Sequence, residues 1–195
     1  FTEALELLAV ARDKGCKGTA FDELEEKLGS STSKFEIQIE RLLKLIDQGE
    51  IAKVLEVCEL LLRKIPDSLS LLNVVSLANE KSGNFNAAVD NYKQILRTRP
   101  NSKVAYLNMG NALQKQGKLE EAVEAYNKAL SIKPDYAEAY NNMGNALQDQ
   151  GKLDEAIEAY NKALAVKPDL ANAYSNMGNA LKEQGKLDEA IEAYK

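Results

Sequence analysis

Apolar residues recur along most of the chain at the three- and four-residue spacing of an α-helix. In residues 137–170 one apolar stripe is followed, after Gly151, by a second. The first contains Ala139, Tyr140, Met143, Gly144 and Leu147, and the second contains Leu153, Ala156, Ile157, Tyr160, Ala163 and Leu164. Residues at this spacing share one side of a helix. Pro168 then ends the second helix, because proline has no amide to donate and the residue before it avoids helical geometry. The pattern predicts a pair of helices joined by a short turn, with Gly144 and Ala156 where the two helices approach closely.

The same pattern repeats every 34 residues. Glycine recurs at positions 15, 49, 83, 117, 151 and 185, and proline at positions 66, 100, 134 and 168. Residues 103–136 and 137–170 are identical at 25 of 34 positions. A single helix pair cannot bury both of its apolar stripes, so neighbouring pairs must stack. The sequence therefore predicts an all-α solenoid.

The 34-residue period divides the chain into units that differ in regularity. These units are 1–34, 35–68, 69–102, 103–136, 137–170 and 171–195, of which 35–68 is degenerate and 171–195 is truncated. Residues 1–34 contain two short helical patterns, and either a degenerate repeat or an unrelated helical cap accounts for them. The segment 35–48 is apolar around most of its circumference, as a helix covered on several sides requires.

The composition excludes several kinds of chemistry. The chain of 195 residues has no His and no Trp, and its cysteines are Cys16 and Cys58. This removes histidine-dependent catalysis, most metal sites and a disulfide framework. We therefore expect no enzyme activity, no metal and no cofactor. Cys58 and the recurring tyrosines, at positions 106, 126, 140, 160, 174 and 194, are expected to be packing residues of the core.

The charge pattern bears on partners and on location. A net charge of −5 with interspersed signs is unlike a nucleic-acid-binding surface. No apolar run approaches the roughly 18 residues of a membrane span. We therefore expect no nucleic acid and no membrane partner, and a cytoplasmic location, since no targeting signal is visible. The acidic pairs that open each second helix complement its dipole.

The residues that recur in each unit resemble those of the tetratricopeptide repeat family. Unit 103–136 supplies Tyr106, Met109, Gly110, Leu113, Ala122, Tyr126, Ala129 and Pro134, and unit 137–170 supplies the residues 34 positions later. The resemblance covers 35–195, and the regular repeats are similar to those of O-linked N-acetylglucosamine transferases and of bacterial proteins of this family. It implies a right-handed superhelical solenoid of antiparallel helix pairs. It also implies a protein–protein interaction scaffold that holds an extended peptide or a helix of its partner in the concave groove.

In this family, positions 2, 5, 6, 9, 12 and 13 of each first helix point into the groove. Carried over to this sequence, these positions supply Asn108, Asn142 and Asn176 in one row, Asn111, Asn145 and Asn179 in another, and Asn73 nearer the N-terminus. A carboxamide carries both a donor and an acceptor, so a ladder of them can hold a peptide by its backbone. The alternative is that these asparagines bond across adjacent helices. The matching N-terminal positions are apolar, among them Leu43, Ile46 and Val74, and either form an apolar pocket or are covered. We favour the second reading.

Two further functions remain open. The chain starts with Phe1 and stops at Lys195 inside a helix, so we expect a fragment of a longer protein. It could then be the substrate-recruiting arm of an enzyme, for example a glycosyltransferase, whose catalytic domain lies beyond residue 195. A self-assembling scaffold that associates through its open C-terminal end is the other possibility.

Overall fold

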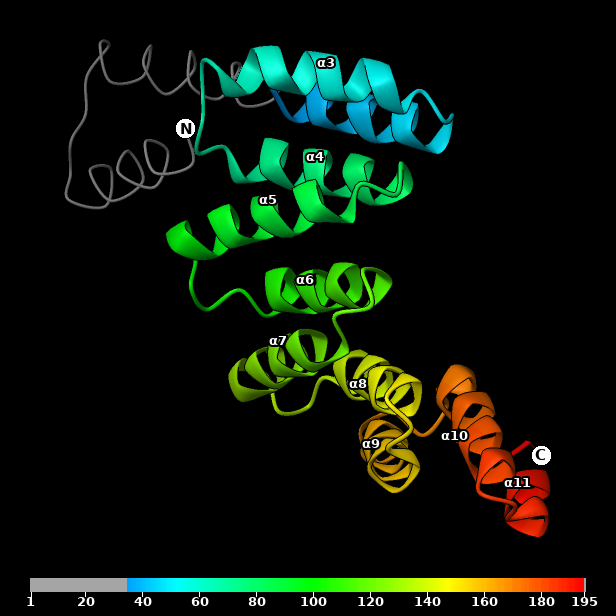
Figure 1. The fold of residues 1–195 in the computed structure, drawn as a ribbon. Coiled ribbons are helices and arrows are strands. Elements are labelled where there is room, and N and C mark those ends of the chain that lie inside the picture. Colours follow the sequence, from blue (N-terminus) through cyan, green and yellow to red (C-terminus); the bar gives the residue numbers. More distant parts are fainter. Residues whose placement is uncertain (1–34, 195) are drawn as a thin grey trace, which may run out of the picture.

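The computed structural model describes residues 35–194, and every regular element in this range is an α-helix (Figure 1). The expectations for residues 1–34 lie outside the described residues. A helix over 35–47 is followed by α3 (Ile51–Leu62), α4 (Leu69–Lys81), α5 (Phe85–Thr98), α6 (Lys103–Lys115), α7 (Leu119–Ile132), α8 (Ala137–Asp149), α9 (Leu153–Val166), α10 (Ala171–Glu183) and α11 (Leu187–Tyr194). None of these helices is both long enough and apolar enough to cross a membrane.

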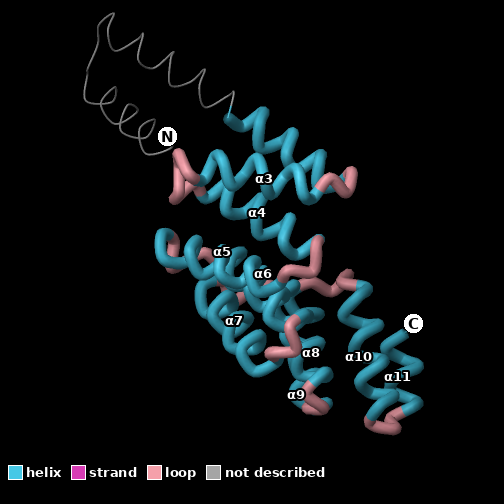
Figure 2. The backbone as a smooth tube through the Cα atoms, turned by 45° about the horizontal axis from the view of Figure 1, so that its top comes forward, coloured by secondary structure: helices cyan, strands magenta, loops and turns pink. Residues whose placement is uncertain are grey.

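Consecutive helices form pairs, and the pairs stack into one extended array. Within a pair α4 packs on α5, α6 on α7, α8 on α9 and α10 on α11, and each pair also contacts the next. Successive pairs are rotated, so that α4 and α5 lie across the view whereas α10 and α11 run steeply down it (Figure 1). The helices are joined by short loops (Figure 2). The predicted all-α superhelical solenoid is confirmed.

The turn within each pair depends on a glycine in the left-handed region. Gly151 has φ 76°, which a side chain disfavours, and its amide donates to the Gln148 carbonyl at 2.8 Å. The Lys152 amide donates to the Leu147 carbonyl at 2.9 Å, which closes the end of α8. The glycine that recurs every 34 residues therefore reverses the chain between two helices.

A second glycine makes room for an aromatic ring. A Cβ added to Gly144 in α8 would lie 2.5 Å from Cε1 of Tyr160 in α9. Gly110 and Tyr126 have the same relation one pair earlier. The close approach expected at Gly144 is thus made with the Tyr160 ring, which lies directly against the α8 backbone.

Of the predicted core residues, three are fully buried, Tyr106 and Tyr140 are partly buried, and two are exposed. Tyr126, Tyr160 and Cys58 are fully buried, and burial raises the pKa of the Cys58 thiol to about 11. Tyr174 and Tyr194 are 39% and 49% exposed, so the expectation that all the repeat tyrosines are core residues is wrong for them. Both lie on the last helix pair, where residues 35–194 contain no further pair to cover them.

The helix over 35–47 is covered on fewer sides than its sequence predicts. Leu42 and Ile46 are buried and belong to one core cluster with Val74. Ile37 and Leu43 are exposed, so the expectation of cover around most of the circumference is wrong for these two side chains. Ile46 and Val74, being buried, cannot line an open apolar pocket.

Candidate functional site: the asparagine rows

The predicted site residues lie on the first helices of four successive pairs. Asn73 is on α4, Asn108 and Asn111 on α6, Asn142 and Asn145 on α8, and Asn176 and Asn179 on α10. Asn73 and Asn179 are exposed, and the other five are partly buried. The first helices of neighbouring pairs touch, α6 with α8 and α8 with α10. The asparagines of the last three pairs therefore lie close enough to interact from one pair to the next.

The second row of asparagines is bonded to the tyrosine of its own pair. The hydroxyls of Tyr126, Tyr160 and Tyr194 lie 2.9, 2.8 and 2.7 Å from the Oδ1 atoms of Asn111, Asn145 and Asn179 respectively. Each of these contacts joins a first helix to the second helix of the same pair. One end of each of these amides is thus held inside the pair.

The first row bonds between pairs. Asn142 Nδ2 donates to Asn111 Oδ1 at 2.9 Å, and Asn176 Nδ2 donates to Asn141 Oδ1 at 3.1 Å. Asn141 Nδ2 donates in turn to Asn142 Oδ1 at 3.3 Å. These four residues form an asparagine chain that runs from α6 to α10. Asn141, only 8% exposed, was not among the predicted site residues, although it occupies a groove position of its repeat.

The two remaining predicted asparagines, Asn108 and Asn73, lie outside the asparagine chain. Asn108 is hydrogen-bonded to the Tyr92 phenol, an interaction that by itself lowers the pKa of that group. Burial outweighs it and raises the pKa of Tyr92. The Asn73 side chain makes no hydrogen bond within residues 35–194 and is exposed, so it is open to a partner.

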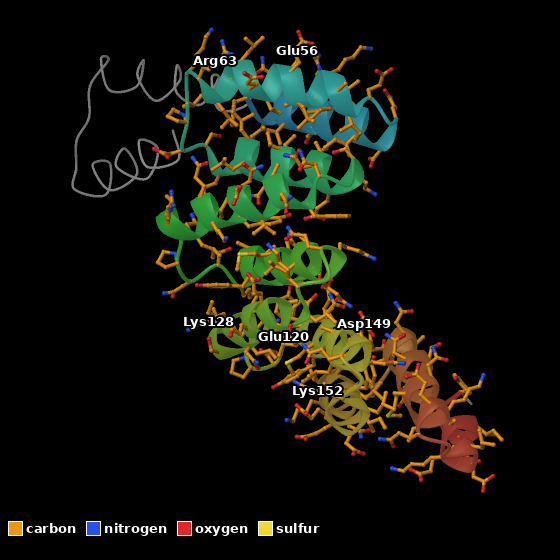
Figure 3. All side chains as sticks on the ribbon, viewed as in Figure 1. Glu56, Arg63, Glu120, Lys128, Asp149 and Lys152 are labelled. Carbon is orange, nitrogen blue, oxygen red and sulfur yellow. The ribbon has the colours of Figure 1, made fainter. Side chains whose placement is uncertain are left out.

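A row of glutamines, which the sequence analysis missed, links the tyrosines to the following pair. Tyr126 and Tyr160 hydroxyls lie 3.1 and 3.0 Å from Oε1 of Gln114 and Gln148. Gln114 Nε2 donates to Asp149 Oδ2 at 2.7 Å, and Gln148 Nε2 donates to Glu183 Oε1 at 2.8 Å. Asp149 lies at the end of α8 (Figure 3). The spacing of 35 residues between partners is the only sequence signal that could have indicated these links.

The electrostatics of the site keep its phenols neutral. Burial raises the pKa of both Tyr126 and Tyr160, and the nearby Asp149 carboxylate raises it further. Each hydroxyl therefore carries its single proton across the physiological pH range. Residues 35–194 contain no group of three His, Cys, Asp or Glu side chains that could hold a metal ion.

The asparagines fall into two groups, according to whether their side-chain amides bond to a neighbouring helix pair. Asn111, Asn142 and Asn176 are joined to another first helix or to the asparagine chain, which is the alternative reading of the sequence. Asn145 and Asn179 bond only to the tyrosine of their own pair within residues 35–194. The second terminal atom of each of these two amides makes no further hydrogen bond there and is not among the buried atoms that lack one. It is available to a partner.

Comparison with known proteins agrees with this architecture. A family model described as "TPR repeat" matches residues 110–151 and 144–185, and one described as "Tetratricopeptide repeat" matches residues 91–124. The comparison with curated proteins found no match.

Solved structures share the fold over most of the chain. A crystal structure of MamA superimposes with a TM-score of 0.70 at 26% identity, covering 77% of this chain and 88% of that one. MamA from Desulfovibrio magneticus RS-1 gives a TM-score of 0.72 at 21% identity, covering 82% and 90%. TTC0263, a thermophilic TPR protein of Thermus thermophilus, gives 0.66 at 23% identity, covering 82% and 87%.

The repeated glycines, the buried tyrosines, the stacked helix pairs and both family models therefore agree. The chain is a tetratricopeptide repeat protein, with the fold of a protein-interaction scaffold.

Proposed function

We propose that the concave face of α4 to α10 holds an extended segment of a partner protein by its backbone. The observation that supports this is that the side-chain amides of Asn145 and Asn179 each make a hydrogen bond through one of their two terminal atoms within residues 35–194. Each side chain is anchored at one end by a tyrosine hydroxyl, so the other end is presented in a fixed orientation. A fixed polar group costs less entropy to engage than a free one, which favours binding.

The experiment compares two sets of alanine variants in capture of partners from a cell lysate. The groove variant is Asn145→Ala, Asn179→Ala. It spares Asn142 and Asn176, whose bonds join neighbouring pairs. Tyr160 keeps a contact of 3.0 Å with Gln148 when Asn145 is removed. We expect a partner that the wild type captures to be lost by this variant.

The matched control removes asparagines from the second helices. Asn127 and Asn161 are exposed on α7 and α9 and make no hydrogen bond within residues 35–194. The variant Asn127→Ala, Asn161→Ala is expected to retain the partner. If both variants capture the same proteins as the wild type, and both melt at the wild-type temperature, the groove asparagines do not carry binding.

Self-association is a second candidate, favoured by the exposed apolar side of α11. Leu187 and Ile191 are 59% and 54% exposed, whereas Ile157, one pair earlier, is partly buried and packs against the same core cluster as Met177 of the next first helix. Sedimentation of the 195-residue chain over a range of concentrations tests this. Association that Leu187→Glu, Ile191→Glu abolishes supports it, and a monomer at high concentration contradicts it.

A further inference from the structure

The Tyr160 hydroxyl lies between two amide oxygens. Asn145 Oδ1 is 2.8 Å from it and Gln148 Oε1 is 3.0 Å from it. A neutral phenol has one proton and can donate one hydrogen bond, while its oxygen can also accept. Tyr160 therefore cannot donate to both oxygens. One of the two amides must offer its nitrogen to the hydroxyl.

Gln148 is not free to do so. Its Nε2 donates to Glu183 Oε1 at 2.8 Å, and a carboxylate accepts hydrogen bonds without donating them. Turning the Gln148 amide over would place its oxygen against the Glu183 oxygen. The oxygen of Gln148 therefore faces Tyr160 and accepts the hydrogen bond that its hydroxyl donates.

Asn145 has no such constraint. The oxygen and nitrogen of a carboxamide are nearly equal in size, so both orientations occupy the same space. With Nδ2 toward Tyr160, the amide donates to the hydroxyl oxygen, and both contacts become hydrogen bonds. The Asn145 oxygen is then the atom that faces away from Tyr160, where no residue of 35–194 bonds to it.

The equivalent site on α10 lacks the second acceptor. Lys182 occupies the place of Gln148, and an ammonium group cannot accept a hydrogen bond. Within residues 35–194 Tyr194 accordingly has a single partner, Asn179 Oδ1 at 2.7 Å. Because a phenol donates a hydrogen bond more strongly than it accepts one, Asn179 keeps its oxygen toward the tyrosine and its NH₂ group away from it.

We propose that Asn145 presents its carbonyl oxygen to the groove, whereas Asn179 presents its amide nitrogen. Resting on the proposed groove function, this assigns recognition of a partner's backbone N–H to Asn145 and of a backbone C=O to Asn179. The residue three positions after each asparagine determines the orientation of its amide. This residue is Gln148 for Asn145 and Lys182 for Asn179. Identical asparagines one repeat apart thus recognise opposite groups of a peptide bond.

The same rule applies to the pair before. Tyr126 lies 2.9 Å from Asn111 Oδ1 and 3.1 Å from Gln114 Oε1, and Asp149 fixes the orientation of Gln114. Asn111 therefore also turns its nitrogen to the hydroxyl. Asn142, which contacts the same atom of Asn111, turns with it, and Asn141 and Asn176 turn in the same sense, so that every contact of the asparagine chain keeps one donor and one acceptor. One phenolic proton thus sets the direction of the contact between α6 and α8.

Solution NMR of the free, isotope-labelled 195-residue chain tests the proposal without a partner. We expect strong nuclear Overhauser effects between the Asn145 side-chain NH₂ protons and the Hε protons of Tyr160. The corresponding effects between Asn179 and Tyr194 are expected to be weak, because the Asn179 oxygen separates its NH₂ group from the ring. Equal intensities in the two pairs, or the reverse order, overturn the proposal.

Two variants at Gln148 provide the matched comparison. Gln148→Leu removes the second acceptor, so Tyr160 is expected to donate to Asn145 Oδ1, and the strong effect is lost. Gln148→Glu keeps an acceptor, as Glu80 does for the Tyr92 hydroxyl at 2.6 Å, and the strong effect remains. Both variants are made together with Glu183→Gln, so that no two carboxylates face each other and the difference between the variants isolates the acceptor.

A strong effect in both variants overturns the assignment to Gln148. If Gln148→Leu does not fold, the wild-type comparison of Asn145 with Asn179 still decides. Because the orientations are measured without a partner, they can fail while partner capture succeeds. Capture can likewise fail while the orientations are as expected, so the two proposals are separable.

Discussion

At the residue scale, the absence of a side chain on Gly144 positions the Tyr160 hydroxyl. A Cβ at residue 144 would lie 2.5 to 2.9 Å from three atoms of the ring. We predict that Gly144→Ala lowers the free energy of unfolding by about 1–3 kcal/mol through overpacking, although alanine is the better helix former. Urea denaturation measures this. In the same background Tyr160→Phe is expected to cost less than in the wild type, because the displaced ring has already lost its bonds to Asn145 and Gln148.

The second repeat, residues 69–102, carries a side chain at the position that corresponds to Gly144. Ser76 occupies the place of the glycine there, is fully buried, and donates from Oγ to the Leu72 carbonyl at 2.7 Å. Tyr92 still reaches Glu80, so that repeat accommodates a Cβ. An unchanged stability of Gly144→Ala, with an unchanged effect of Tyr160→Phe, would show that the Tyr160 ring can adjust in the same way.

Because of Cys58, we expect the free energy of unfolding to fall as the pH rises above 9. Burial raises the pKa of its thiol from 9.0 to about 11, so the unfolded chain loses this proton first as the pH rises. The stabilising effect of the neutral thiol is full below pH 9 and is lost between pH 9 and 11. We predict that the free energy of unfolding of the wild type falls by about 2–3 kcal/mol more over this range than that of Cys58→Val. Parallel curves for the two proteins would contradict this.

At the element scale, the acidic residues that open α9 serve two different contacts. Asp154 and Glu155 both lie in the first turn, where negative charge is favourable. Asp154 Oδ1 also accepts a bond from Gln184 Nε2 at 2.7 Å, which joins α9 to the following pair. We predict that Glu155→Ala costs about 0.3–1 kcal/mol and that Asp154→Ala costs more, measured by thermal denaturation. Equal costs would show that the bond to Gln184 adds no net stability.

The helices themselves were predictable from sequence, whereas the contacts between them were not. The apolar stripes, Gly151 and Pro168 locate α8 and α9, because helical periodicity and chain reversal are local properties. The asparagine chain depends on how far each pair is rotated against the next, which no single repeat encodes. Asn141 and Gln148 were missed for this reason: their partners, Asn176 and Glu183, lie 35 residues away.

At the scale of the whole molecule, the contacts between successive pairs make stability a sum of neighbour terms. One core cluster runs from Leu72 on α4 to Ala146 on α8, while smaller clusters cover α9 to α11. In an array of this kind the ends open more readily than the middle. We predict that amide hydrogen exchange is slowest in α6 to α8 and faster in α11, where Leu187 and Tyr194 are exposed.

A core substitution tests whether opening is local. Leu113 is 3% exposed and belongs to the cluster that joins α4 to α8. Leu113→Ala is expected to cost about 2–5 kcal/mol and to speed exchange in α6, α7 and the helices that contact them, α5 and α8. Exchange in α3 and α11 should be unchanged, because neither helix packs against α6 or α7. If exchange accelerates equally in every helix from α3 to α11, the array unfolds as one cooperative unit. A destabilising substitution in any one repeat would then weaken partner binding at every repeat.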